Sequence, residues 1–429
     1  MTFEDIVNEI VETPRFRKLP GFVVIKALIR KIGYMENIPV VHVAGTNGKG
    51  SVVMMMASIL QSAGYKVGTF TSPHLVDIRE RIRINNQMIS KDAFTKIYRR
   101  LYKYMEALAL EGYEKASFFE IIFAMALMYF DKEKPDIIIL ETGIGGRLDT
   151  TNALNNKILT IITNISLDHT QILGETLQAI AYEKSGIMRS NIPVVLYNTI
   201  KEVNDTVRSA AAKINAPYVE VLPFDAEIIV RNQESIDFSL RNKYYEYETI
   251  HMNTAGDYQI DNAKIAITGM HMLQQQFKFT KSDVIEGINN FKWLGRMTYI
   301  TPGILLDGAH NKEGIEAFVN HIDRHEKHKA IDLVFVCMDD KQDIEMIEVL
   351  CNIKRLRSVF IPREKYIKAQ KEERLRLLFR QNGFENVYLI DQLKDLIVKR
   401  RKDMKDDQLL CCVGSLYLVG DIIKIIEEG

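Results

Sequence analysis

The sequence predicts an α/β protein with a P-loop parallel-sheet domain of the ATPase type, followed by a smaller Rossmann-like, doubly wound domain. Three observations lead to this prediction. Strand and helix patterns alternate through the first two thirds of the chain, and a glycine-rich segment joins an apolar strand to a helix near residue 45. A second alternating series begins after Trp293-Leu294-Gly295-Arg296. We therefore expect one domain over residues 1–295 and another over 296–429.

Apolar, β-branched runs in the first domain are typical of strands buried in a parallel sheet. Such strands are expected at 38–43, 67–71, 137–140, 158–163 and 194–196. Helices are expected at 51–63, 92–110, 118–132, 176–188, 257–276 and 281–290. Ser117 followed by Glu120 three residues later predicts a capping box at the start of the third helix. Period-two alternation between 226 and 247 predicts hairpins on one side of the sheet.

The second domain repeats the alternation over about 130 residues, a typical domain size. Its strands are expected at 304–306, 333–336, 358–361, 387–390 and 409–413. Helices separate these strands, and the last helix is expected at 416–426. We interpret the charged stretch 399–407 as a solvated loop.

Composition limits the classes of function. Lys plus Arg and Asp plus Glu both total 56, so the net charge is zero, which argues against a large nucleic-acid footprint. Four cysteines lack a metal-binding spacing, and the adjacent Cys411 and Cys412 are expected to be buried free thiols. The polar start of the chain shows no signal peptide, and no apolar run approaches the roughly 20 residues of a membrane span. We expect a soluble, cytoplasmic protein.

The glycine-rich turn is Gly45-Thr46-Asn47-Gly48-Lys49-Gly50-Ser51. A turn of this kind points unpaired backbone N–H groups toward the helix N-terminus, where phosphate binds well. Lys49 adds a mobile positive charge, and Ser51 is placed to reach a magnesium ion. The turn departs from the usual Walker A pattern, since two residues separate the first glycines and Gly50 follows the lysine. The alternative is plain structural punctuation, which the lysine and serine disfavour.

Polar residues also follow three other expected strands. Ser72 follows the strand at 67–71, and Glu141 follows the strand at 137–140, beside glycines that permit close approach. Ligands bind at the carboxyl ends of strands in open α/β sheets, and a carboxylate there suits a hard cation. His169 comes shortly after the strand at 158–163. Taken alone, His169 is more often a packed or surface histidine, and the segment after Ser72 is equally well a plain loop.

The turn resembles the nucleotide loop of the folylpolyglutamate synthases and dihydrofolate synthases, the folate branch of the ATP-dependent Mur ligase superfamily. Further segments resemble the family in the family's own order, from about residue 18 to 420. They are Ser72-Pro73-His74-Leu75, Asn164-Ile165-Ser166-Leu167-Asp168-His169, Glu183-Lys184-Ser185, Asn262-Ala263, Gly295-Arg296-Met297, Asp307-Gly308-Ala309-His310-Asn311 and Gly414-Ser415-Leu416-Tyr417. In one departure, Val23 and Val24 replace the family's charged pair after Lys18-Leu19-Pro20-Gly21-Phe22, which weakens the expectation of pterin contacts there.

The resemblance implies an ATP site, two magnesium sites and a modified lysine. The implied ATP-binding residues are Thr46, Asn47, Gly48, Lys49, Gly50, Ser51, Asn262, Arg296 and Asp307. The implied metal ligands are Ser51, Ser72, Glu141 and His169, with one magnesium ion near Ser51, Ser72 and Glu141 and the other near Glu141 and His169. Lys184 would be carbamylated by carbon dioxide, which turns an ammonium group into a carboxylate surrogate. The implied catalytic residues are Lys49, Lys184 and His310.

The resemblance also implies sites for a folate and for L-glutamate. The implied folate-binding residues are Pro73, Arg81, Phe118, Phe119, Leu148, Asp149 and Thr150. Phe118 or Phe119 would stack on the flat ring, although aromatic residues at a helix start are equally often core. The implied glutamate-binding residues are His310 and Ser415, and a plain helix-capping role is the alternative for Ser415. The first domain would hold ATP and folate, and the second would clamp the nucleotide and glutamate.

The implied activity is ATP-dependent ligation of L-glutamate to a folate or pteroate carboxylate through an acyl phosphate. The substrates would be ATP, L-glutamate, and dihydropteroate or reduced folates, and the enzyme would act as a monomer. Three alternatives remain open from the residues. They are another Mur-type amino-acid ligase, a P-loop NTPase or kinase, and a nucleotide-binding regulator without turnover.

Overall fold

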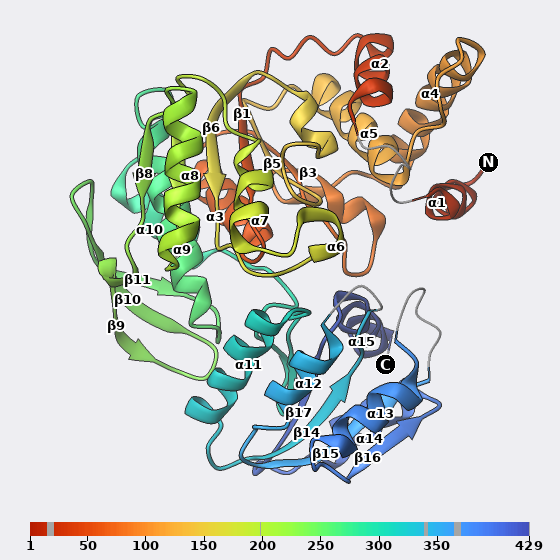
Figure 1. The fold of residues 1–429 in the computed structure, drawn as a ribbon, viewed down its shortest axis with the longest axis vertical. Coiled ribbons are helices and arrows are strands. Elements are labelled where there is room, and N and C mark those ends of the chain that lie inside the picture. The colour runs from red at the N-terminus through yellow and green to blue at the C-terminus, as the bar shows by residue number, and fades with distance from the viewer. Residues whose placement is uncertain (15–20, 198, 339–341, 364–369, 429) are drawn as a thin grey trace.

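The computed structural model has two lobes, an upper one formed by the first part of the chain and a lower one formed by the last part (Figure 1). It describes residues 1–14, 21–197, 199–338, 342–363 and 370–428. In the segment Lys18-Leu19-Pro20-Gly21-Phe22, for which few pterin contacts are expected, residues 18–20 lie outside these ranges. The chain passes from one lobe to the other between Asn289 and Thr298, and the expected boundary at 295 falls in this connection.

The upper lobe contains an eight-stranded sheet with the order β4-β3-β2-β5-β1-β6-β7-β8. The strands are β1 (Val40–Ala44), β2 (Val67–Phe70), β3 (Ile82–Ile84), β4 (Gln87–Met88), β5 (Ile137–Glu141), β6 (Lys157–Ile162), β7 (Val194–Leu196) and β8 (Tyr218–Glu220). The pairs β2-β5, β5-β1, β1-β6, β6-β7 and β7-β8 are parallel. The pairs β2-β3 and β3-β4 are antiparallel. The register places Val43 beside Glu141 and Ala44 beside Ile162. The carboxyl ends of β1, β5 and β6 therefore lie at one edge of the sheet. This edge carries the glycine-rich turn, Glu141 and residue 163.

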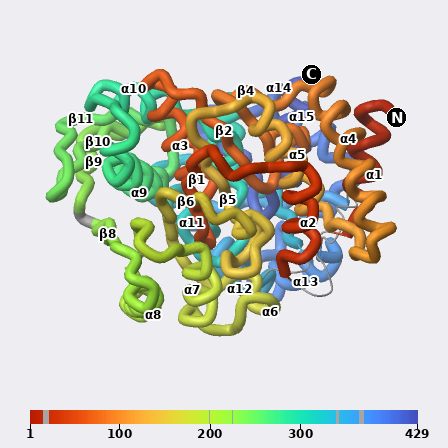
Figure 2. The backbone as a smooth tube through the Cα atoms, turned by 90° about the horizontal axis from the view of Figure 1, so that it is seen from above, coloured from red at the N-terminus to blue at the C-terminus, as the bar shows by residue number. Residues whose placement is uncertain are grey.

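Helices cover both faces of this sheet (Figure 2). On one face, α3 (Lys49–Ser62), α9 (Tyr258–Leu273) and α10 (Lys281–Asn289) form a shared core with the strands. On the other face lie α1 (Phe3–Glu12), α2 (Val23–Ile32), α4 (Lys91–Leu110) and α5 (Phe118–Glu133). Beyond them, α7 (Leu177–Ser185) and α8 (Lys201–Lys213) cover β6 and β7. Short helices are η1 (Ile78–Arg81), η2 (Thr150–Ala153), α6 (Thr170–Leu173) and η3 (Pro223–Asp225).

Local capping explains why α5 begins where the sequence predicts. The Ser117 side chain accepts from the Glu120 backbone, and the Glu120 carboxylate accepts from the Ser117 backbone at 2.9 Å. The predicted capping box is confirmed. The sequence analysis missed α1, α2 and α8, which are amphipathic helices. The apolar positions of α1 and α2 bury against α4 and α5, and those of α8 bury against α7 and β7.

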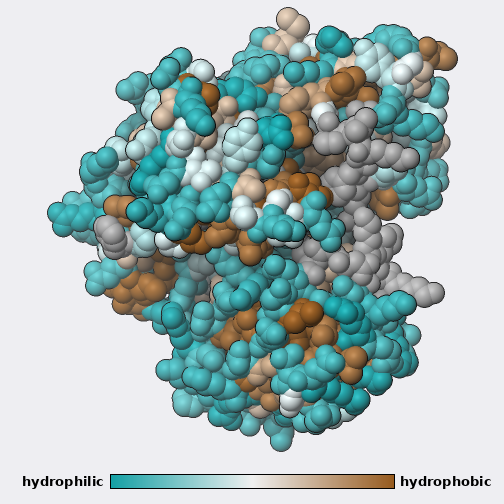
Figure 3. Space-filling view, in the orientation of Figure 1, coloured by the Kyte–Doolittle hydropathy of each residue, from teal (hydrophilic) through white to brown (hydrophobic). Residues whose placement is uncertain are grey.

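A separate three-stranded antiparallel sheet extends from the upper lobe, with strands β9 (Ala226–Arg231), β10 (Ile236–Arg241) and β11 (Glu246–Met252). The predicted hairpins are confirmed, but they form their own sheet. Alternate residues such as Ile236 and Phe238 are buried in the core around α3 and α9. At the outer edge, β9 exposes Ile228, Ile229 and Val230, and apolar residues gather at this place in Figure 3.

The lower lobe is a second α/β unit with the sheet order β12-β13-β17-β14-β15-β16. Its strands are β12 (Thr298–Thr301), β13 (Ile304–Leu306), β14 (Ala330–Phe335), β15 (Leu356–Pro362), β16 (Val387–Ile390) and β17 (Gln408–Val413). Its helices are α11 (Lys312–His325), α12 (Asp343–Leu350), α13 (Glu372–Gln381), α14 (Leu393–Asp403) and α15 (Leu416–Glu428). Apart from the antiparallel β12, the pairing is parallel, which confirms the predicted fold class.

One interpretation from the sequence is wrong. Residues 399–403 of the expected charged loop continue helix α14, which ends at Asp403. Leu393 and Ile397 bury one face of this helix, while the charged residues form its solvated face. Charge alone therefore misled the interpretation, because a solvated helix face has the same composition as a loop.

The state of the thiols follows the sequence prediction. Cys411 and Cys412 are buried on β17, and all four cysteines are free. Among the described residues, we find no helix with the length and apolar character needed to cross a bilayer.

Candidate active site

The glycine-rich turn connects β1 to α3, which begins at Lys49. Gly48 has φ +86°, and a Cβ atom there would lie 2.2 Å from the Asn262 Oδ1 atom. A Cβ at Gly45 would lie 1.7 Å from the Thr163 Oγ1 atom. Glycine is thus required at both positions, by close approach to α9 and to the end of β6. Asn262, expected to bind ATP, packs directly against the turn.

Hydrogen bonds hold the turn against the end of β6. The Thr46 amide donates to the Asn164 carbonyl at 2.7 Å, and the Thr163 hydroxyl donates to the Asn47 carbonyl at 2.7 Å. The Lys49 Nζ atom donates to the Thr46 carbonyl at 3.0 Å, which bends the lysine back over the turn. Ser51 is buried in the first turn of α3. The arrangement matches a phosphate site at a helix N-terminus with a lysine above it.

Glu141 is the buried carboxylate at the centre of the sheet edge. Its Oε2 atom accepts from the Ser72 backbone nitrogen at 2.9 Å and would lie 3.4 Å from a Cβ atom on Gly50. Burial raises the pKa of the Glu141 carboxyl, and the positive charges of Lys49, Arg296 and Arg81 oppose this rise. The site therefore combines one buried carboxylate with cations from the turn, the loop after β2 and the lower lobe.

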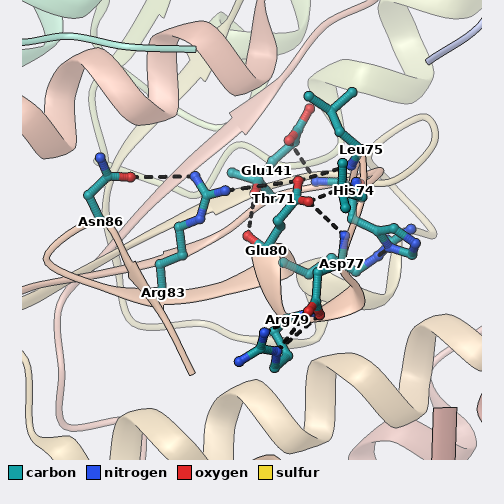
Figure 4. A network of polar contacts seen from close by, with 12 residues as sticks. Thr71, His74, Leu75, Asp77, Arg79, Glu80, Arg83, Asn86 and Glu141 are labelled. Atoms are coloured by element: carbon teal, nitrogen blue, oxygen red, sulfur yellow. Dashed lines mark hydrogen bonds and ion pairs between the residues drawn. The ribbon is translucent and has the colours of Figure 1, made fainter. Parts of the chain in front are cut away.

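The loop after β2 is held in shape by Glu80, at the centre of the network in Figure 4. The Glu80 carboxylate accepts from three successive backbone nitrogens, those of Leu75, Val76 and Asp77, at 2.8–2.9 Å. Three donors on one carboxylate fix the loop that begins with Ser72 and Pro73. The loop therefore presents a defined surface beside Glu141.

Arg81 joins this loop to the start of α5. Its Nε atom donates to the His74 Nδ1 atom at 2.8 Å, and its guanidinium lies 5.1 Å from the centre of the Phe118 ring. Phe119 points elsewhere: its ring packs edge-on against Phe70 at 5.6 Å and fills the space where Gly143 has no side chain. Phe118 and Arg81 are thus both buried beside the loop, whereas Phe119 is partly exposed and packs against Phe70.

Asp149 has a structural place in the expected folate segment. One carboxylate oxygen accepts from the Gly143 and Ile144 backbones at 2.9 and 3.0 Å. The other accepts from the Thr151 backbone at 2.9 Å and from its hydroxyl at 2.5 Å. Asp149 therefore organises the loop from within. Its neighbour Leu148 is exposed, and Thr150 opens η2.

Lys184 lies near the end of α7 and is buried. Its Nζ atom donates to the Gly45 carbonyl at 2.7 Å. A helix lysine that is buried against the start of the glycine-rich turn is unusual, since most are solvent-facing. The structure therefore places Lys184 at the phosphate turn.

The lower lobe contributes Asp307 at the end of β13. Its carboxylate accepts from the Tyr258 hydroxyl at 2.7 Å, from the Met297 backbone at 2.8 Å and from the Ala309 backbone at 2.7 Å. Burial raises the pKa of Asp307, and the Arg296 charge opposes the rise. Asp307 thus ties the connection between the lobes to α9, next to the predicted ATP residues Arg296 and Asn262.

Asp168 lies between two histidines from different lobes. Its Oδ2 atom is 3.9 Å from the Nε2 atoms of both His169 and His310. His169 opens the short helix α6 with φ +49°. His169 thus lies beside Asp168, whereas the Glu141 carboxylate accepts from the Ser72 backbone. Ser415 is buried and accepts from the Tyr417 backbone at 3.2 Å, so it caps α15.

The residues that would hold magnesium fit a hard, oxygen-seeking ion. Ser51 in the first turn of α3 and Glu141 at the end of β5 are both buried, and both offer oxygen ligands. Within the described ranges, no group of three His, Cys, Asp or Glu side chains forms a ready-made metal cage.

Sequence reasoning missed several residues of the site. Glu313 on α11 contacts Asn47 and Asn164, and Trp293 lies against Gly50. His42 on β1 contacts the Thr151 hydroxyl at 2.7 Å. None of these follows a strand directly, so the rule that places ligands at strand ends did not find them.

A phosphate turn, a buried carboxylate and a second lobe that reaches the same edge define an ATP-dependent ligase of the Mur type. Residues 43–270 match the Mur ligase middle domain, and residues 295–425 match the dihydrofolate synthetase C-terminal domain. The chain belongs to the Mur ligase family and, within it, to the dihydrofolate synthase/folylpolyglutamate synthase branch.

Relatives and solved structures agree along the whole chain. The chain is 34% identical over 426 residues to the dihydrofolate synthase/folylpolyglutamate synthase of Bacillus subtilis, covering 96% of each. It is 31% identical over 447 aligned positions to the folylpolyglutamate synthase of Lacticaseibacillus casei, covering 100% of each. The crystal structure of folylpolyglutamate synthase from Thermotoga maritima superposes with a TM-score of 0.84 at 28% identity, covering 99% of this chain and 96% of that one. The predicted family and enzyme class are confirmed.

Proposed function

We propose that this ligase joins L-glutamate to the carboxylate of a folate or pteroate, with cleavage of ATP and an acyl phosphate intermediate. One observation carries the proposal. The buried Glu141 carboxylate lies within the field of Lys49, Arg81 and Arg296, which come from the phosphate turn, the loop after β2 and the lower lobe. Positive charge from three directions suits the site where a phosphoryl group passes to a substrate carboxylate.

In the first step, a carboxylate oxygen of the acceptor attacks the γ-phosphorus of ATP, and ADP leaves. Lys49, Arg296 and the backbone N–H groups at the start of α3 stabilise the charge that builds on the phosphoryl oxygens. Magnesium, when bound, neutralises further phosphate charge; Ser51, Ser72 and Glu141 would hold one ion, and Glu141 and His169 a second. Arg81 and Phe118 would orient the acceptor, with Pro73, Phe119, Leu148, Asp149 and Thr150 shaping its surroundings.

In the second step, the amino group of L-glutamate attacks the acyl phosphate, phosphate leaves, and the nitrogen gives up a proton. We assign the acceptance of that proton to His310. Its Nδ1 atom lies 2.7 Å from the Gly308 carbonyl, which only accepts, so Nδ1 carries a hydrogen. The proton would pass to Nε2, which lies 3.9 Å from the Asp168 Oδ2 atom, and that carboxylate would stabilise the charged imidazolium. Ser415, the residue directly before α15, would help hold the incoming glutamate.

We assign carbamylation to Lys184, which is buried and bonded to the phosphate turn. A carbamate would replace a positive charge with a negative one at that place. We expect Lys184→Ala to lose activity and removal of bicarbonate to lower wild-type activity. Normal activity of Lys184→Ala, or wild-type activity that does not change when bicarbonate is removed, would overturn the assignment.

The decisive experiment is phosphate release from Mg-ATP with L-glutamate, comparing dihydropteroate with tetrahydrofolate. Release that requires glutamate and one of the two acceptors supports the proposal and shows which activity dominates, or whether one site performs both. Release that requires neither glutamate nor an acceptor would overturn the proposed reaction. Release with glutamate and a cell-wall precursor alone would assign it to another Mur-type ligase.

A monomer acting in the cytoplasm completes the proposal. The four free cysteines support a reducing compartment. Light scattering on the purified chain would test the monomer, and a dimer at micromolar concentration would contradict it.

A further inference from the structure

We propose that Glu313 is a positioning residue that holds the lower lobe in register over the phosphate turn and so brings His310 to the reacting atoms. Glu313 lies in the first turn of α11, which stands in the lower lobe on the side of the upper one (Figure 1). The inference rests on the proposed ligase function for its activity readout, but its structural readout is independent of that function.

Two carboxamides of the upper lobe donate to this single carboxylate. The Asn47 Nδ2 atom lies 2.7 Å from Oε2 of Glu313, and the Asn164 Nδ2 atom lies 2.8 Å from Oε1. Hydrogen bonds to an ionised acceptor are shorter and stronger than neutral ones, and two oxygens with separate donors fix direction as well as distance. Glu313 thus forms a two-point contact between the lobes.

Both donors belong to one rigid piece of the upper lobe. The Asn164 carbonyl accepts from the Thr46 amide at 2.7 Å, and the Asn47 carbonyl accepts from the Thr163 hydroxyl at 2.7 Å. The end of β6 and the phosphate turn therefore move together. A contact made to both reports the position of the phosphate turn itself.

The other end of the contact is fixed to the catalytic loop of the lower lobe. Asn311 caps α11, since its Oδ1 accepts from the Gly314 backbone at 2.9 Å, and its Nδ2 donates to the Asn47 Oδ1 atom at 3.0 Å. His310 directly precedes Asn311, and its Nε2 atom faces Asp168. Glu313 lies two residues after the cap. A contact that holds its carboxylate therefore also holds the start of α11, and His310 beside it, relative to the phosphate turn. Glu313 therefore sets the reach of His310 without touching the substrate.

The chain offers a matched set of variants. Glu316 lies one turn further along α11, about half exposed, and pairs loosely with Lys312 at 3.9 Å. Glu316→Ala removes a carboxylate from the same helix without touching the upper lobe. Asn164→Ala removes one donor, and Glu313→Gln keeps only one accepting oxygen.

We expect Glu313→Ala and Asn164→Ala each to lower kcat roughly tenfold and to lower the Tm by a few degrees, as loss of charge-assisted contacts would. Glu313→Gln should lie between, and Glu316→Ala should match the wild type. The double variant Glu313→Ala/Asn164→Ala should be no slower than the slower single variant, because Glu313→Ala already removes the hydrogen bond that Asn164→Ala removes. A kcat of the double variant that falls by the product of the two single effects would overturn the proposal, and so would full kcat in Glu313→Ala.

Small-angle scattering of the ligand-free chain provides the second readout. We expect a larger radius of gyration for Glu313→Ala than for wild type and Glu316→Ala, since the contacts that remain between the lobes, those of Asn311 with Asn47 and of Tyr258 with Asp307, leave the lobes freer to move apart. An unchanged radius together with reduced kcat would also overturn the positioning role. If wild type releases no glutamate-dependent phosphate, the proposed function fails, while the scattering result still decides the contact.

Discussion

The Glu141 carboxylate accepts a hydrogen bond from the Ser72 backbone at 2.9 Å, which joins the ends of β5 and β2 at the centre of the site. Burial raises the pKa of Glu141 above its ordinary value of 4.5. A raised carboxyl pKa means that ionisation is less favourable in the folded chain than in the unfolded one. The free energy of unfolding therefore falls as the pH rises from the unfolded pKa through the folded one.

We predict that Glu141→Gln inactivates the enzyme but raises the Tm of the ligand-free chain at neutral pH. The gain should shrink toward pH ~4, where the wild-type carboxyl is protonated. Calorimetry at several pH values checks this, with Glu175→Gln, an exposed carboxylate of the same lobe, as control. A Tm below wild type at neutral pH would show that the Ser72 contact outweighs desolvation.

Gly45→Ala should prevent the phosphate turn from forming. The new Cβ atom would lie 1.7 Å from the Thr163 Oγ1 atom and 2.9 Å from its Cβ atom. Overpacking of this kind costs about 1–3 kcal/mol of stability. We expect a lower Tm and loss of ATP binding by calorimetric titration. Adding Thr163→Ala should recover part of the Tm but not all, since the Thr163 Cβ atom remains; no recovery at all would place the strain elsewhere.

Arg81→Ala should weaken the acceptor site and leave the nucleotide site nearly intact. Its guanidinium lies over Phe118 and beside His74, on the side of the loop that we assign to folate. Loss of one charged hydrogen bond to the acceptor, about 1.5–2 kcal/mol, corresponds to roughly a 10- to 30-fold higher KM for the acceptor. Steady-state kinetics with each substrate varied in turn measure this. Arg100→Ala, exposed on α4, should change neither constant, and an equal rise in the KM for ATP would contradict the assignment.

Trp293 should report nucleotide binding, because it is the one tryptophan of the chain and lies against the phosphate turn. A Cβ atom on Gly50 would be 3.1 Å from its ring, and the Arg83 guanidinium lies 5.3 Å from the ring centre. We expect Mg-ATP to change the fluorescence of the wild type. Lys49→Ala should need far more ATP for the same change and lose roughly 10²–10³-fold in kcat. A signal that is insensitive to ATP would mean that the turn and the connection between the lobes move independently.

The sequence predicted much of the fold because its signals are local. The turn Gly45–Ser51, the capping box at Ser117 and the apolar strands each follow from neighbouring residues. The strands' carboxyl ends also located Glu141, since a parallel sheet brings such ends to one edge. The helical stretch at 399–403 was missed because its signal is not local. Its buried face is recognised only from Leu393 and Ile397 together with the strands they cover.

By itself, the sequence determined which chemistry is available: a phosphate turn, a strand-end carboxylate, and cations in two domains. Tertiary structure alone decided which of these groups meet and which serve the fold. It turned Asp149 inward to hold its own loop, packed Phe119 away from Arg81, and placed Glu313 across the lobes from Asn47 and Asn164. Contacts between residues far apart in the chain depend on how two sheets stack and face each other, and no local pattern encodes that geometry.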